Sequence, residues 1–169
     1  MNARLSVARP RLVVVGNGMA GMRTIEELLK LAPDTYEITV FGSEPHPNYN
    51  RILLSPVLAG EQTLEQIVLN SREWYAEHGI ALHAGTTISR IDRARRAVEA
   101  ADGTRVTYDR MLLATGSNPF ILPVPGNDLP GVITYRDIAD TEAMIAASHE
   151  YRHAVVIGEG CSGWRRRTD

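Results

Sequence analysis

Cysteine is almost missing from this chain, since Cys161 is the single cysteine among 169 residues. One cysteine excludes a disulfide within the chain, and it excludes any four-cysteine zinc or iron–sulfur site built by the chain alone. The five histidines are scattered without the spacing of a ligand motif. We therefore expect no metal site and histidines that are satisfied or face solvent, with haem ligation by one of them as the less favoured alternative.

Long apolar runs and an excess of charge of one sign are also lacking. No apolar stretch approaches the roughly 18 residues that a membrane span needs, and the N-terminus carries no apolar signal segment. The formal net charge of −2 gives no electrostatic reason to bind nucleic acid or an anionic membrane. With 44% hydrophobic and 22% charged residues, the composition is typical of one globular domain. A cytoplasmic location is the default expectation.

A glycine-rich motif stands where a nucleotide-binding turn would begin. Residues 11–15 predict a central parallel strand, residues 20–31 an amphipathic helix, and residues 37–41 a second strand, which together make a βαβ unit. The turn between the first strand and the helix reads Gly16-Asn17-Gly18-Met19-Ala20-Gly21. Its first glycine allows the tight turn, its second lets the backbone approach a pyrophosphate, and its third lets the helix pack against the strand.

An acidic residue completes this pattern, because Glu44 follows the second strand at the distance suited to a ribose hydroxyl. A glycine turn used only for packing is the alternative interpretation. Strand, glycines, helix and acidic residue all in register favour nucleotide binding, but they do not separate FAD from NAD.

The rest of the chain predicts further strands and helices. Asp102-Gly103 between alternating segments is typical of a hairpin. The expected elements are a helix at 70–78 capped by Asn70, strands between 80 and 107, a central strand at 108–114 ending at Thr115-Gly116, a connection at 117–131, a helix at 138–149 and a strand at 153–157.

Three stretches of the sequence carry a family resemblance. They read GNGMAGMRTIEELL, FGSEPHPNYNRILLSPVLAG and YDRMLLATGSNPFILPVPG. They resemble the FAD- and NAD(P)H-dependent pyridine nucleotide-disulfide reductase superfamily, and within it the family of assimilatory NAD(P)H nitrite reductase large subunits. The resemblance runs from about residue 11 to residue 157. It implies an α/β fold, with a doubly wound, Rossmann-like FAD-binding domain at 1–116 that includes a small β-meander, a linker at 117–137, and the beginning of a second Rossmann-like domain, for NAD(P)H, at 138–169.

The same resemblance implies which residues bind the cofactors. The FAD contacts expected from it are Gly16, Asn17, Gly18, Met19, Ala20, Gly21, Glu44, Arg51, the backbone near Ile88, Thr115 and Gly116. The second glycine signature, with Gly158 and Gly160, is expected to bind NAD(P)H. No catalytic side chain is expected, because hydride transfer from NAD(P)H to FAD is the chemistry of the cofactors themselves.

The predicted role of Arg51 depends on the family resemblance more than the predicted roles of the other residues do. Related ferredoxin reductases carry Pro-Tyr-x-Arg-x-x-Leu-Ser-Lys beside FAD, and the matching positions here are Tyr49, Arg51, Leu54 and Ser55, with Pro56 in place of the lysine. From spacing alone, Arg51 would be a solvated loop arginine. The resemblance instead implies that its guanidinium contacts FAD. Tyr49 is expected only to pack its loop.

The function implied by the resemblance requires segments that this sequence does not contain. Family members carry a later Gly-Asp segment that completes the FAD site, and cysteine clusters for an iron–sulfur cluster and sirohaem, all absent here. We expect the FAD-binding portion of a nitrate-assimilation oxidoreductase that passes electrons toward nitrite, inactive when alone. The alternatives are an inactive or weakly nucleotide-binding fragment and a ferredoxin- or rubredoxin-reductase type of parent. FAD and NAD(P)H are the expected partners, and the oligomeric state stays open.

The last residues depart from the family pattern. Nitrite reductases of this type read about VVIGGGLLGLEAA, whereas this chain reads VVIGEGCSGWRRR. One allowed coding of the segment from Gly158 regains the family pattern when a single G is inserted after its fourth base. We therefore expect a frame-shifted and truncated sequence after Gly158, in which Cys161 has no evolved role. A reactive thiol at a helix N-terminus is the alternative. Sequencing the coding DNA tests this, and codons for residues 159–167 that give no such motif in another frame would exclude the frameshift.

Overall fold

The structure is a computed structural model that describes residues 8–157. The chain divides into two compact units. The first contains the described residues up to Asn50 together with Val68–Ser117, and the second contains Arg51–Ile67 and the described residues from Asn118 onward.

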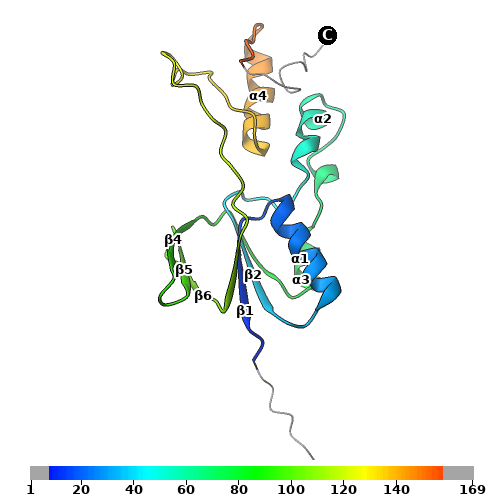
Figure 1. Ribbon diagram of the computed structural model, residues 1–169. Helices are drawn as coiled ribbons and strands as arrows, with labels where there is room; N and C mark the ends of the chain where they lie inside the picture. Colours follow the sequence, from blue (N-terminus) through cyan, green and yellow to red (C-terminus); the bar gives the residue numbers. More distant parts are fainter. Residues whose placement is uncertain (1–7, 158–169) are drawn as a thin grey trace, which may run out of the picture. The chain divides into compact units, whose positions relative to one another are not determined.

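A four-stranded parallel sheet forms the centre of the first unit, in the order β3-β2-β1-β7 (Figure 1). The strands are β1 (Arg11–Val15), β2 (Glu37–Gly42), β3 (Ala81–Ala84) and β7 (Arg110–Leu113). All residues of β1 after its first are buried. A parallel strand covered on both faces must be apolar on both sides, which is why this strand reads as an uninterrupted apolar run in the sequence.

Two helices cover one face of this sheet, α1 (Met19–Leu31) and α3 (Arg72–Glu77) (Figure 1). Met22 and Ile25 of α1 and Tyr75 of α3 are at most 1% exposed and belong to one core cluster with Leu12 and Val14 of β1. Burial of each such side chain contributes about 1.5–3 kcal/mol. The helix expected at residues 20–31 is therefore confirmed, and its apolar stripe faces the sheet.

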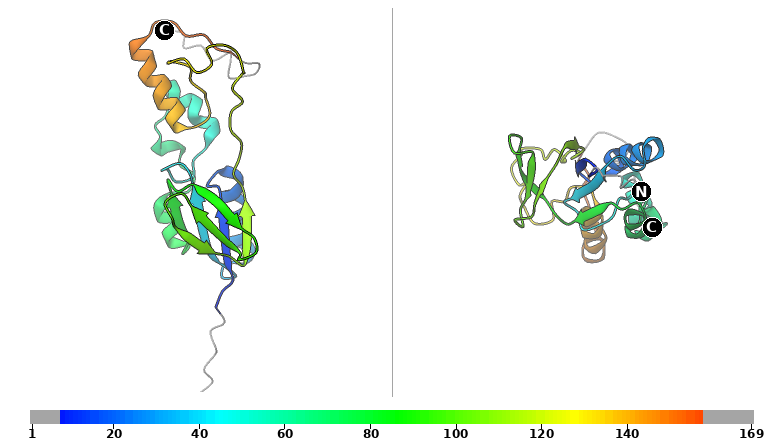
Figure 2. Two further views of the ribbon diagram at one scale, coloured as in Figure 1. Left: turned by 90° about the vertical axis from the view of Figure 1, so that its left-hand side faces the viewer. Right: turned by 90° about the horizontal axis from the view of Figure 1, so that it is seen from below.

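A small antiparallel sheet covers the other face, in the order β4-β5-β6 (Figure 2, left). Its strands are β4 (Ile88–Asp92), β5 (Ala97–Ala100) and β6 (Arg105–Thr107). Val98 and Tyr108 form a second core cluster with Val13, Val15 and Phe41. The α/β class and the small β-meander are confirmed. Within residues 8–157, however, this sheet occupies the face where a doubly wound core would carry helices.

The second unit is built from short helices. These are η1 (Arg51–Leu53), α2 (Leu54–Leu58), η2 (Glu65–Ile67) and α4 (Ile138–Glu150). Helices α2 and α4 lie side by side. The Tyr135 hydroxyl donates a hydrogen bond of 3.1 Å to the Ser55 hydroxyl, and the Asp137 carboxylate caps α4 by accepting from the Asp140 N–H. Within residues 8–157, no helix is long and apolar enough to cross a bilayer.

The cap predicted for α3 is wrong by one residue. Ser71, not Asn70, precedes the helix, and its hydroxyl accepts a hydrogen bond from the Trp74 N–H (3.3 Å). Asn70 is 2% exposed; its amide nitrogen donates to the Glu26 carboxylate (2.9 Å), and its amide oxygen accepts from Asn48 (2.7 Å). The Asn70 side chain is therefore taken up by partners far along the sequence, which leaves capping to the hydroxyl of Ser71.

The strand predicted at residues 153–157 is also wrong. This segment has no strand structure, and Val155 is 88% exposed. A parallel strand exists only when neighbouring strands satisfy its backbone N–H and C=O groups, and no strand within residues 8–157 pairs with this segment. A β-branched apolar run is therefore insufficient to form a strand here.

Candidate functional site

The glycine loop, which we define as Gly16, Asn17 and Gly18, joins the carboxyl end of β1 to α1. Gly16 has φ +113°, and a Cβ atom at this position would lie 2.1 Å from the carbonyl oxygen of Ala114. Ala114 directly follows β7, and its N–H donates to the carbonyl of Val15 (2.8 Å). Only glycine meets both conditions, the left-handed backbone and the close approach. The glycine loop therefore lies against the chain that leads into Thr115 and Gly116.

The other two glycines of the motif have contrasting surroundings. A Cβ at Gly21 would lie 3.0 Å from the Ala114 Cβ and from the carbonyl oxygen of Gly16, so the helix approaches the sheet closely there. At Gly18, no described atom lies within 4 Å of such a Cβ. These are the roles expected of the third glycine, which packs, and of the second, which leaves room for a ligand.

The N-terminus of α1 suits an anion. Gly18 occupies the capping position, no side chain within the described residues caps the helix, and its first turn holds no acidic residue. The first backbone N–H groups and the positive end of the helix dipole are thus available for phosphate oxygens. The N-terminus of α1 and the open space at Gly18 therefore fit the pyrophosphate of a dinucleotide.

Glu44 lies in the loop after β2, at the same edge of the sheet; we call residues 43–48 the Glu44 loop. The hydroxyl of Tyr49 donates a hydrogen bond of 2.7 Å to Oε2 of Glu44. Tyr49 is 5% exposed, so it packs the loop as expected, and it also directs the Glu44 carboxylate. The Gly85 N–H donates a hydrogen bond of 2.8 Å to the backbone carbonyl of Glu44.

The side chain of Asn17 bonds within the protein. Its Oδ1 accepts a hydrogen bond of 2.6 Å from the Tyr75 hydroxyl, and its Nδ2 donates to the carbonyl of His46 (3.3 Å). Burial raises the pKa of Tyr75 to about 12, and hydrogen bonds to Asn48 and Asn17 offset only part of that effect. Asn17 therefore links the glycine loop to the Glu44 loop.

The structure brings some of the predicted site residues together and leaves others apart. The glycine loop, the first residues of α1, the Glu44 loop and the end of β7 meet at one edge of the parallel sheet. Ile88 is half-buried at the start of β4. Arg51 belongs to the second unit, where its Nη1 donates to the carbonyl of Arg136 (3.1 Å). Its contact with FAD stays a prediction. Gly158 and Gly160 lie outside the described residues.

Two tyrosines have roles that the sequence did not reveal. The family pattern includes Tyr49 without indicating its bond to Glu44, and the sequence around Tyr75 indicates no role at the site. The Tyr75 hydroxyl meets Asn17 across 58 residues of sequence, so no local spacing could have indicated this contact.

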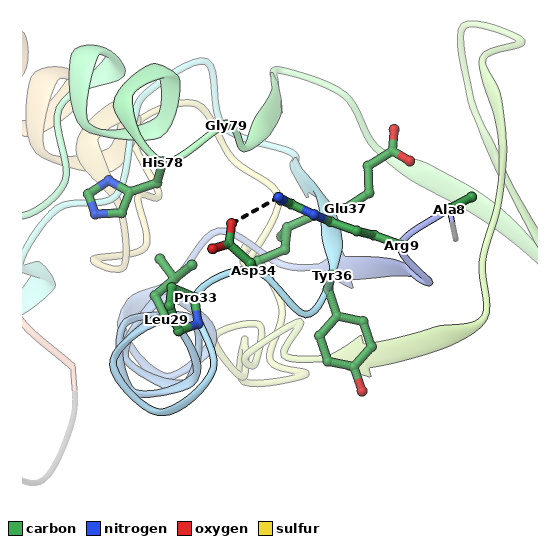
Figure 3. Close-up of a pocket in the computed structure, with 10 residues that line it drawn as sticks. Ala8, Arg9, Leu29, Pro33, Asp34, Tyr36, Glu37, His78 and Gly79 are labelled. Carbon is green, nitrogen blue, oxygen red and sulfur yellow. Dashed lines mark ion pairs between the residues drawn. The ribbon is translucent and has the colours of Figure 1, made fainter. Parts of the chain in front are cut away.

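A surface pocket lies at the opposite end of the sheet and does not belong to this site (Figure 3). Its volume is about 350 Å³, and its lining includes Leu29, Tyr36 and His78. Arg9 and Asp34 form an ion pair of 2.9 Å there, with side chains 53% and 82% exposed. These residues flank the amino ends of β1 and β2, whereas ligands of open parallel sheets bind beyond the carboxyl ends of the strands. Among the described residues, no group of histidine, cysteine or carboxylate side chains could hold a metal ion.

Known protein sequences are similar to this chain over most of its length. The family model for pyridine nucleotide-disulphide oxidoreductase matches residues 10–165. Nitrite reductase [NAD(P)H] of Bacillus subtilis (strain 168) is 51% identical over 158 residues, which cover 93% of this chain and 20% of that protein. The assimilatory nitrate reductase electron transfer subunit of the same organism is 50% identical over 155 residues, which cover 92% of this chain and 20% of that protein.

A solved structure extends the comparison to the fold. Putidaredoxin reductase, in its covalent complex with putidaredoxin, superposes with a TM-score of 0.73 at 31% sequence identity, covering 83% of this chain and 34% of that chain. The chain spans about a fifth of the length of the two curated relatives. Since the family model covers most of the chain, the resemblance found in the sequence is confirmed, and the chain belongs to the pyridine nucleotide-disulphide oxidoreductase family.

Proposed function

We propose that this chain is the FAD-binding N-terminal portion of an NAD(P)H-dependent oxidoreductase of the nitrite reductase type. The observation that carries the proposal is the uncapped N-terminus of α1 with open space at Gly18. Its support from relatives is the 51% identity to a nitrite reductase.

In this proposal, the glycine loop and the first turn of α1 bind the FAD pyrophosphate through backbone N–H groups at Gly18, Met19 and Ala20. Gly16 and Gly21 hold that turn against β7, and the Glu44 carboxylate accepts a hydrogen bond from a ribose hydroxyl. Bound FAD would supply the redox chemistry, as the acceptor of a hydride from NAD(P)H and the donor of electrons toward nitrite. The contribution of the chain itself is to bind and orient the nucleotide.

The remaining site residues belong to the same proposal. Thr115 and Gly116 border the FAD phosphates, the backbone near Ile88 receives the adenine, and Arg51 contacts phosphate oxygens. The proposed organisation is an FAD segment at 1–116, a linker at 117–137 and the start of an NAD(P)H domain at 138–169. In the intact parent, the turn that begins at Gly158 would bind NAD(P)H; the frameshift hypothesis gives Gly160 of this chain no such role.

There are two alternative hypotheses, and the flavin-binding test described below distinguishes the second of them from the proposal. A parent of the ferredoxin reductase type is supported by the 31% identity to putidaredoxin reductase. A fragment that binds nucleotide weakly or not at all is the second.

The first test is the absorbance spectrum of the purified chain after it is mixed with FAD, separated from free flavin and treated anaerobically with NADH. We expect the chain to retain flavin, because the glycine loop and the Glu44 loop are both formed, and we expect no bleaching by NADH. A chain that retains no flavin contradicts the proposed binding. Bleaching would show that the chain assembles both nucleotide sites, contrary to the expectation that it is inactive alone.

A further inference from the structure

The Asn17 amide has a fixed orientation between the two loops of the candidate site. Its neighbours are the His46 carbonyl, at 3.3 Å, and the Tyr75 hydroxyl, at 2.6 Å. A carbonyl only accepts hydrogen bonds, so the amide nitrogen must face His46 and the amide oxygen must face Tyr75. Tyr75 must then be the donor, and its proton is what completes the chain of bonds from α3 through the glycine loop to the Glu44 loop.

Tyr75 is suited to be a permanent donor. It is 1% exposed, and the cluster that encloses it includes Ile25 and Ile80. The Trp74 ring lies nearly perpendicular to the Tyr75 ring, with ring centroids 5.3 Å apart. Because burial raises the pKa of Tyr75 to about 12, the hydroxyl keeps its proton at every pH at which the protein would work. The core therefore holds this donor in place.

Asn17 is also confined by contact with the end of β2. A Cβ atom at Gly42 would lie 2.7 Å from the Asn17 Cβ, so the Asn17 side chain rests directly on the backbone of Gly42. Glycine at position 42 thus allows the glycine loop to approach β2 this closely. The Asn17 side chain is consequently held on three sides, by Gly42, Tyr75 and the His46 carbonyl.

We propose that Tyr75 and Asn17 are positioning residues, which fix the glycine loop relative to the Glu44 loop and so set the affinity of the site for a dinucleotide. The inference rests on the proposed function, because it assumes that these two loops bind the pyrophosphate and a ribose. Neither side chain needs to touch the nucleotide; Tyr75 acts through Asn17.

The test is a double-mutant cycle in the full chain, with the variants Tyr75→Phe, Asn17→Ala and their combination. FAD is titrated into each protein at a temperature well below its unfolding transition. We expect Tyr75→Phe to raise the Kd for FAD about tenfold, since a lost donor leaves the Asn17 oxygen unsatisfied. If Tyr75 acts through Asn17, the double variant binds FAD no more weakly than Asn17→Ala alone. If the two substitutions act independently, the increases in Kd that they cause separately would instead multiply in the double variant.

Amide hydrogen exchange in the protein without nucleotide provides a second readout. The Gly16 N–H donates to the carbonyl of Phe41 (2.8 Å) and reports on the glycine loop. We expect Tyr75→Phe to speed its exchange about tenfold relative to the amides within β1. Tyr108→Phe is the matched control, because Tyr108 is a buried tyrosine of the opposite core cluster, and it should change neither the Kd nor the exchange of Gly16.

The outcomes separate the two proposals. A wild-type chain that binds no FAD overturns the proposed function and this inference together. Wild-type binding with an unchanged Kd in Tyr75→Phe, or with independent effects in the double variant, overturns this inference alone. An exchange rate that rises equally throughout β1 would also overturn it, because it would indicate a general loss of stability rather than release of the glycine loop.

Discussion

Replacement of Gly16 by alanine is expected to destabilise the first unit by at least about 3 kcal/mol, which is in the range of severe single substitutions. The added methyl group would lie 2.1 Å from the Ala114 carbonyl oxygen, and φ +113° is unfavourable for alanine. The clash involves backbone, so no side-chain rotation relieves it. Thermal unfolding followed by circular dichroism should show a midpoint about 10 °C lower or more.

Gly79→Ala is the control for backbone strain without a clash. Gly79 has φ +64° in the same unit, and no described atom lies within 4 Å of an added Cβ. Its replacement should cost about 1 kcal/mol, the penalty for a left-handed backbone alone. Equal losses of stability in the two variants would contradict the close approach of the glycine loop to the end of β7.

Gly18→Val is expected to affect binding rather than stability. It should weaken FAD binding about 100-fold or more while leaving the fold intact. Gly18 has φ −89° and ψ 174°, an extended backbone that valine adopts readily, and no described atom lies within 4 Å of an added Cβ. Loss of glycine at the capping position should cost less than about 1 kcal/mol. Under the proposed function, however, the branched side chain fills the space through which the backbone approaches the pyrophosphate.

The measurements are the Kd for FAD and the unfolding midpoint of the same protein samples. Gly18→Ala supplies a graded comparison, since its single methyl group should reduce the affinity less than valine does. A folded Gly18→Val protein with unchanged affinity for FAD would show that the dinucleotide does not approach Gly18, and the proposed geometry of binding would have to be abandoned.

The parts of the fold that the sequence predicted are those encoded by local patterns. The buried strand β1, the helix α1 and the strand β2 follow from runs and periods within about 30 residues, as does the glycine motif between them. Asp102-Gly103 likewise predicted the turn between β5 and β6, where Gly103 has φ +89°. In each case, one segment contains all of the information that its structure requires.

The features that the sequence did not reveal depend on distant partners. Asn70 is a residue type that often caps helices, but its side chain instead donates a hydrogen bond to Glu26, 44 residues away. Residues 153–157 have strand composition without a pairing strand among the described residues. The Tyr75 to Asn17 bond is of the same kind. Side-chain chemistry alone does not decide between a local partner and a remote one of equal quality, because that choice depends on which segments the topology brings together.

The place of β1 inside the parallel sheet has a consequence for the order in which the protein can fold during its synthesis. β1 pairs with β2 on one side and with β7, which ends at Leu113, on the other. While the ribosome is still making the intervening residues, one edge of β1 has no partner, although the hairpin of β5 and β6 can already form from local contacts. A nascent chain that ends before β7 therefore exposes an apolar strand edge, the kind of edge that chaperones protect from aggregation.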